Sequence, residues 1–380
     1  MRKSIVLSAV AATSLTGMMI QGTAGATQAG GAPSLTGGAH PASPHARYTA
    51  IPYQGTLPRA RATTTSVPMF SHSVVSGGRT FTYRQVGKDP FVKQSVPTST
   101  VAVKVIPLRL QFTNRTFDPT STACSPSGSP AALLAKSPLE KTRAYTVGGT
   151  AVGTDQYTGF ARRAEYFNQV KTGALNPGYH LNLSFTQLAP TTVGVNGSAG
   201  TSCGAFGSVT IASLDNYVRT TLIPSYGAQI TANTFPLVLL TNVVMTDSGG
   251  GCCILGYHSA FTRNGQQTYG VGEFDTNGSF SGVKDISALS HEIAEWMDDP
   301  LVNNATPAWG HIGQVSGCQS NLENGDPLSG TIIPISMNGY TYHPQELAFS
   351  SWFYPGSPNP GLNGWFSTNG KFRSAAAHCT

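Results

Sequence analysis

The chain of 380 residues is poor in charge, since only 11% of its residues are Asp, Glu, Lys or Arg. Its 23 basic residues form no Lys/Arg run and are not interleaved with aromatic side chains, which argues against a nucleic-acid-binding surface. Glycine (43) and proline (25) are abundant instead, as is typical of loop-rich exported proteins. The composition therefore favours an extracellular protein that does not bind nucleic acid.

Long apolar runs are also lacking beyond the first 26 residues, which argues against a membrane span. Arg2 and Lys3 precede an apolar segment over residues 5–20, and Ala24-Gly25-Ala26 offers a small-x-small cleavage site. This pattern predicts a secretory signal peptide over residues 1–26. We therefore expect a secreted mature protein.

No Cys-x-x-Cys pair occurs, which argues against a zinc knuckle or a thioredoxin-like motif. An even number of cysteines in an exported chain predicts disulfides. The six are Cys124, Cys203, Cys252, Cys253, Cys318 and Cys379. Because adjacent cysteines do not readily bond to each other, Cys252 and Cys253 are expected to reach different partners, with Cys318 a candidate for one of them.

Composition divides the chain into four parts. The signal peptide is followed by residues 27–98, much of which is rich in Gly, Ala, Pro, Ser and Thr, and we interpret this stretch as a disordered linker or a removed pro-segment. A β-branched run near residue 101 opens a folded domain over residues 99–300. Residues 301–380 are rich in Gly, Pro and aromatic side chains and are expected to form a loop-rich, disulfide-stabilised C-terminal lobe that completes the site.

Within residues 99–300, apolar periodicity predicts strands and helices in alternation. Strands are expected over 101–112, 180–188, 235–245 and 269–274, and helices over 155–171, 213–223 and 284–299. This order favours an α/β or α+β domain with a mixed sheet. The strand at 269–274 is a candidate edge to which an extended peptide could add.

The helix over 284–299 carries the clearest chemical motif. His291 and Glu295 are one turn apart, so both side chains can reach one metal ion. Glu292 would be displaced around the helix toward a water on that ion. The same arrangement of side chains occurs in the His-Glu-x-x-His zinc helix, with Glu295 here in place of the second histidine. The alternative interpretation is an ordinary solvated polar face.

Two protein ligands do not complete a catalytic zinc site. Glu323 and Asp299 are both candidates for the third ligand, and His258 is a further ligand or a group that stabilises an oxyanion. Zn²⁺ is the expected ion. Mn²⁺ or Ca²⁺ also fits, since a second carboxylate makes the donor set harder.

These motifs resemble a known kind of protein. Residues 290–295 with 299–300, together with 256–258 and 323–326, resemble a group of secreted bacterial and fungal proteins with a zincin-like His-Glu-x-x-Glu helix. They are also similar to the plant phosphate-induced, Exordium-like secreted proteins. The resemblance covers roughly residues 235–330 and implies a zincin-like fold and a metal-binding exported protein.

The sequence thus supports two hypotheses about function. The first is a secreted metallopeptidase that cleaves peptide or protein substrates, with His291 and Glu295 as ligands, Glu292 as the general base and His258 at the oxyanion. The second is a non-enzymatic exported or cell-surface protein with a structural or vestigial metal site, in which the C-terminal aromatic residues could bind carbohydrate or cell wall. The sequence makes no prediction of the oligomeric state.

Overall fold

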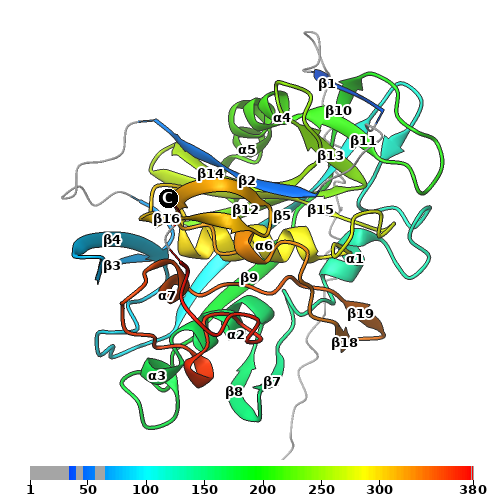
Figure 1. The fold of residues 1–380 in the computed structure, drawn as a ribbon. Coiled ribbons are helices and arrows are strands. Elements are labelled where there is room, and N and C mark those ends of the chain that lie inside the picture. The colour runs from blue at the N-terminus through cyan, green and yellow to red at the C-terminus, as the bar shows by residue number, and fades with distance from the viewer. Residues whose placement is uncertain (1–33, 40–45, 56–64, 378, 380) are drawn as a thin grey trace, which may run out of the picture. The chain divides into compact units, whose positions relative to one another are not determined.

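Strands dominate the fold, with 39% of the residues that the structure describes in strands and 18% in helices. The computed structural model describes residues 34–39, 46–55, 65–377 and 379, all of which belong to the unit of residues 33–380 (Figure 1). The predicted signal peptide lies outside the described residues. Among the described residues, no helix is both long and apolar enough to cross a membrane.

Eight strands pair in a ring. In order around it they are β10 (Thr191–Asn196), β1 (Ser34–Ala39), β11 (Gly207–Thr210), β13 (Val243–Thr246), β14 (Ile254–Thr262), β15 (Gln266–Phe274), β12 (Thr234–Thr241) and β5 (Ser99–Gln111). The parallel pairing of β5 with β10 closes the ring into a barrel of mixed parallel and antiparallel strands. Three more strands extend this sheet: β2 (Arg47–Gln54) pairs with β14, and β9 (Leu181–Gln187) and β6 (Thr116–Phe117) pair with β5.

The barrel strands contribute side chains to two separate apolar cores. On β12, Leu237 and Leu239 belong to one core, whereas Val238 and Leu240 belong to the other. Alternate residues of a strand point to opposite faces, so a strand buried on both faces is apolar throughout. The first core includes α6 (Ser287–Asp298) and α2 (Tyr157–Glu165). The second includes the continuous helical segment of α4 (Ile211–Tyr217), a π-turn over Val218–Leu222 and α5 (Ile223–Ser225).

Four hairpins and several short helices surround these cores. The hairpins are β3 (Met69–Ser76) with β4 (Arg79–Val86), β7 (Arg143–Val147) with β8 (Thr150–Asp155), β16 (Ala305–Ile312) with β17 (Val315–Asn321), and β18 (Ile335–Met337) with β19 (Tyr340–Tyr342). The short helices are α1 (Pro130–Leu134), α3 (Phe167–Val170) and α7 (Ser350–Phe353), with 3₁₀ turns at Gly227–Gln229, Asp326–Leu328 and Leu362–Gly364.

The predicted fold class is wrong. A zincin-like α/β or α+β domain built around a metal-site helix was expected, but the strands instead close into an eight-stranded barrel within a mostly β protein. The helix at 287–298 exists, yet it packs against the outside of a barrel sheet. The error has a physical cause: the strands that close the ring, such as β11 (Gly207–Thr210), are short and rich in Gly, Ser and Thr, so they carry little apolar periodicity.

Two smaller expectations are also corrected. The strand at 269–274 is part of β15, which pairs with β14 on one side and β12 on the other and is therefore not a sheet edge. The disulfides are Cys124–Cys203, Cys252–Cys253 and Cys318–Cys379, so the adjacent cysteines bond to each other and Cys318 bonds to Cys379. Three disulfides are compatible with an extracellular protein. The described part of residues 27–98 contains β1 to β4; whether it is removed as a pro-segment stays a prediction.

Candidate functional site

Helix α6 lies close to the barrel sheet because two strand positions lack side chains. A Cβ atom added to Gly256 on β14 would lie 2.6 Å from Cγ of Glu292, and one added to Gly272 on β15 would lie 2.8 Å from Cδ2 of Leu289. The apolar stripe of the helix seals this contact, with the ring of Trp296 stacked 3.8 Å from that of Phe235. Every residue of α6 is buried, so its polar side chains also face other protein segments instead of water.

His291 on α6 is fully buried. Its Nε2 lies 2.9 Å from Oε1 of Glu295, as the one-turn spacing predicted, and 3.6 Å from Oδ1 of Asp326. Its Nδ1 lies 3.1 Å from Oε1 of Gln345. The ring of Tyr48, on β2, stacks on the imidazole at 3.8 Å between centroids. Four segments that are distant in sequence thus meet at this one histidine.

His258 on β14 is the second buried histidine of the site. Its Nε2 lies 3.2 Å from the backbone oxygen of Asp299, whereas its Nδ1 lies 3.4 Å from Oε2 of Glu292 and 3.7 Å from Oε2 of Glu295. Oε2 of Glu323 is 3.9 Å from Nε2. The two oxygens of Glu295 therefore face two different histidines.

In each imidazole, one ring nitrogen donates its N–H to an oxygen acceptor. The amide of Gln345 donates to the carbonyl of Gly325, so its oxygen is left to accept the Nδ1–H of His291, and the Asp299 carbonyl accepts the Nε2–H of His258. Burial lowers the pKa of His258 to about 3 and that of His291 to about 4, which keeps both rings neutral. Each ring consequently directs a lone pair at carboxylate oxygens, an arrangement that calls for a cation or a proton in between.

The carboxyl groups of the site repel one another in a dry environment. Burial, reinforced by neighbouring carboxylates, raises the pKa of Glu292, Glu295 and Glu323 well above the usual range, and burial raises that of Asp326 to about 6. The charge of Glu295 contributes to the raised pKa of Glu323. Within the described part of the chain, no Lys or Arg forms an ion pair with these four groups.

Three buried polar atoms of the cluster have no hydrogen-bond partner: Nε2 of His291, Oε1 of Glu292 and Oε2 of Glu323. Buried polar atoms are rarely left unsatisfied, because desolvation without a partner costs about 1–3 kcal/mol or more. Two groups of side chains have ligand atoms close enough to hold an ion, and they share Glu295: His291 with Glu295 and Asp326, and His258 with Glu292 and Glu295.

The structure therefore brings together five of the six residues expected from the sequence: His291, Glu292, Glu295, His258 and Glu323. The sixth, Asp299, contributes its backbone carbonyl, while its carboxylate accepts from the backbone N–H groups of Asn303 and Asn304.

Asp326, which was not among the ligands expected from the sequence, lies in the His291 group. The sequence does contain a sign of this position, because the neighbouring Gly325 allows the backbone to lie close to His291. A Cβ atom added to Gly325 would lie 2.4 Å from Nδ1 of His291. Tyr48 and Gln345 had no such signal, because neither belongs to a recognisable motif.

A cavity of about 380 Å³ borders the cluster. Glu295, Glu323 and Asp326 line it, together with residues 47–50 of β2 and 315–318 of β17. The side-chain amide of Gln314 joins the two segments, since it accepts from the Tyr48 N–H at 2.7 Å and donates to the Tyr48 carbonyl at 3.0 Å. The cluster is thus buried but lies directly beside a pocket that is partly open to solvent.

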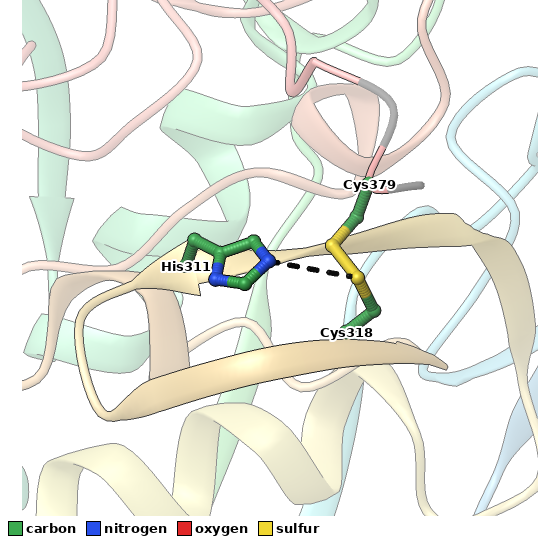
Figure 2. A group of neighbouring side chains, drawn as sticks. All are labelled: His311, Cys318 and Cys379. Carbon is green, nitrogen blue, oxygen red and sulfur yellow. Dashed lines mark hydrogen bonds between the residues drawn. A yellow bond between two sulfur atoms is a disulfide. The ribbon is translucent and has the colours of Figure 1, made fainter.

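A third group of possible ligand atoms does not form a comparable site. His311, Cys318 and Cys379 lie together beside the β16–β17 hairpin, and Figure 2 shows the imidazole directed at the sulfur atoms. Nε2 of His311 is 3.8 Å from Sγ of Cys318. Because the two cysteines are joined in a disulfide, they offer no thiolate to a metal.

Comparisons of the chain with protein-family models, curated proteins and solved structures found no match. The likeness to secreted His-Glu-x-x-Glu proteins therefore stays a prediction that rests on the motifs at residues 256–258, 290–300 and 323–326.

Proposed function

We propose that the protein is an exported metal-dependent peptidase, in which His291, Glu295 and Asp326 hold a divalent cation beside the cavity. The observation that carries this proposal is the buried Nε2 of His291, which has no hydrogen-bond partner and faces two carboxylate oxygens at 2.9 and 3.6 Å. The predicted signal peptide and the three disulfides support export.

The donor set fits a divalent cation. One imidazole nitrogen and two carboxylate oxygens are common zinc ligands, and donors in a tetrahedral zinc site lie about 3.3 Å apart when each is about 2.0–2.1 Å from the ion. The two distances at His291 lie on either side of that spacing. The Nδ1–H of His291 is hydrogen-bonded to Gln345, and a histidine that binds a metal usually has its other ring nitrogen held by such a bond. Two oxygens beside one nitrogen also suit Mn²⁺.

A bound divalent cation would polarise the substrate carbonyl and make a water molecule more acidic. The chain must supply the base that accepts the proton of that water. Glu323 suits this role, because it lines the cavity, Asn321 donates to its Oε1 at 3.2 Å, and its Oε2 has no partner. Its raised pKa also suits it to return the proton to the leaving amine. Glu292, the base expected from the sequence, does not line the cavity and faces His258.

The surroundings of the cavity favour a peptide as substrate. Residues of two strands, β2 and β17, line the cavity. Backbone N–H and C=O groups bind extended peptides by adding them as a further strand. A polypeptide is therefore the substrate class that this lining supports best.

A second candidate function is a non-enzymatic exported protein in which the same cluster holds a structural cation. The observation that favours it is burial, because His291, Glu292 and Glu295 are at most 1% exposed and Tyr48 covers the imidazole. Structural sites are closed, whereas catalytic sites keep a position open to substrate. Binding of carbohydrate by the C-terminal aromatics has less support, since Trp309, Trp352 and Phe353 are buried in a core.

One experiment separates the two candidates. The purified protein would be stripped with chelator, reloaded with Zn²⁺ or Mn²⁺, and assayed on casein and a mixed peptide library. Glu323→Gln should retain the metal and lose turnover by about 10²- to 10⁴-fold, the usual contribution of a general base. Glu140→Gln, a carboxyl outside the cluster, is the control and should keep both. A fully loaded wild type that cleaves no peptide would favour the structural role.

A further inference from the structure

We propose that the site is dinuclear: His258, Glu292 and Glu295 hold a second divalent cation, and the carboxylate of Glu295 bridges it to the first. This inference rests on the cation site at His291 proposed above and adds a second one to it. It gives a role to His258 and Glu292, which the proposed chemistry at His291 leaves unused.

The position of Glu295 is the first support. Its Oε1 lies 2.9 Å from His291 and its Oε2 lies 3.7 Å from His258, so the two oxygens of one carboxylate belong to two separate groups of ligand atoms. In each group all ligand atoms lie within 4.8 Å of one another. Carboxylate bridges of this kind occur in hydrolytic sites that hold two cations about 3.5–4 Å apart.

The orientation of His258 is the second support. Its Nε2–H is engaged by the Asp299 carbonyl, and the remaining Nδ1 faces Oε2 of Glu292 at 3.4 Å and Oε2 of Glu295 at 3.7 Å. Oε1 of Glu292 is buried without a partner. An imidazole whose N–H is held by a carbonyl while its lone pair faces carboxylates has the arrangement of a metal ligand.

Charge balance is the third support. Glu292, Glu295, Glu323 and Asp326 are four buried carboxyl groups, and no Lys or Arg among the described residues pairs with them. In the ionised form that metal ligation requires, the four groups carry four negative charges, of which one divalent cation would balance half and two would balance all. Uncompensated charge in a dry interior is costly, so a cluster of this size is better matched to two cations.

The arrangement also gives Glu323 a defined place. Its Oε2 lies 3.9 Å from Nε2 of His258, and it has no hydrogen-bond partner. The general base would then lie next to the bridge, on the side that borders the cavity. Two neighbouring cations would suit hydrolysis of a peptide bond, because one could make the attacking water more acidic while the other polarises the scissile carbonyl.

The first test is a count of bound metal on the wild-type chain, which needs no variant. Chelator-stripped protein would be titrated with Zn²⁺ by calorimetry, and the dialysed product would be analysed for metal by mass spectrometry. Two equivalents per chain are expected. With Mn²⁺, electron paramagnetic resonance should show an exchange-coupled pair. One equivalent, none, or two uncoupled Mn²⁺ ions would overturn the proposal.

Variants then assign the two positions. His258→Asn should bind one equivalent and lose the coupled Mn²⁺ signal, and His291→Asn should also bind one. Glu295→Gln, which removes charge from the bridge, should weaken both equivalents by at least tenfold. His311→Asn is the matched control, because this histidine lies beside a disulfide outside the cluster, and it should keep two. Circular dichroism of each variant confirms folding, and a folded His258→Asn that still binds two would contradict the assignment.

The metal count and the peptidase assay fail independently. Two coupled ions without turnover on any peptide would sink the proposed peptidase and leave the dinuclear centre standing. Turnover with a single equivalent of metal would support the peptidase and contradict the dinuclear centre. The measurement of stoichiometry therefore tests the second site without relying on activity.

Discussion

At the scale of single residues, Glu140 gives the protein a stability that depends on pH. Burial raises the pKa of this carboxyl from 4.5 to about 7, against the weaker opposing effect of Lys141. The folded state therefore binds the proton more tightly than the unfolded chain. Its contribution to stability is fully present below about pH 4.5 and is lost as the pH rises through 7.

Replacing this carboxyl removes that dependence. We expect Glu140→Gln to raise the free energy of unfolding by about 2 kcal/mol at pH 8 and to leave it nearly unchanged at pH 4, as measured by urea denaturation at both values. Asp118, a partly exposed carboxyl whose pKa is lowered by Thr120 and Arg109, is the control, because Asp118→Asn should lower stability at pH 8 instead. An equal gain for Glu140→Gln at both pH values would show that packing, not ionisation, is responsible.

Residue types also decided how much of the site could be predicted. His291 and Glu295 are one turn apart in a recognisable motif, and His258 and Glu323 stand in short segments with few other titratable groups. Tyr48 and Gln345 could not be anticipated, because a stacked ring and an amide acceptor are common side chains that become parts of the site only through the fold.

At the scale of elements, strand β2 covers the site through Tyr48. The Tyr48 side chain is 4% exposed and its ring stacks on His291. The side-chain amide of Gln314 forms hydrogen bonds with both the backbone N–H and the carbonyl of Tyr48. Tyr48→Ala should expose the imidazole, raise the rate at which chelator removes metal by at least tenfold, and lower stability by about 3 kcal/mol. Tyr53→Ala on the same strand is the matched control, since the hydroxyl of Tyr53 forms an exposed hydrogen bond with Thr262 and not with a residue of the cluster. Equal rates of metal release from both variants would contradict a covering role for Tyr48.

The C-terminal end of α6 is anchored by a buried ion pair. Arg162 lies 2.6 Å from Asp298 and 2.9 Å from Glu165, and it donates to the carbonyl of Met297 at 2.8 Å. Arg162→Met would leave two buried carboxyls without their cation, so we expect a loss of about 3–5 kcal/mol in the free energy of unfolding.

The partly exposed pair of Arg109 and Asp118 supplies the comparison. Arg109→Met should cost less than about 1 kcal/mol, because solvent screens exposed ion pairs. Denaturant titration of both variants measures the difference. Similar losses in the two variants would show that the buried pair does not anchor the helix.

At the scale of the whole molecule, the sequence predicted local elements better than their assembly. The three expected helices are present, and the apolar run at 235–245 does contain strands, because each carries its own periodicity. Closure of the barrel depends on partners far apart in the chain, such as Ser34 with Gly194, and on strands with few large apolar side chains. No local pattern specifies such pairing, which is why a mixed sheet in an α/β or α+β domain was expected and the closed barrel was not.

Two long-range disulfides offer a test of how the fold supports the site. Cys318–Cys379 closes 61 residues and starts on β17, which lines the cavity, whereas Cys124–Cys203 closes 79 residues and lines no part of it. Loop-closure entropy depends only weakly on length, so loss of either bond should cost a similar amount, at most about 4 kcal/mol.

Their effects on the site should differ. The pair of substitutions Cys318→Ser and Cys379→Ser should loosen the β17 wall and weaken metal binding several-fold, because Gln314 and Asn321 at its ends contact Tyr48 and Glu323. Cys124→Ser with Cys203→Ser should lower the melting temperature comparably and leave metal affinity unchanged. Thermal unfolding and metal titration of the two double variants measure both quantities. If metal affinity fell equally in both, general destabilisation, and not the wall of the cavity, would account for the loss.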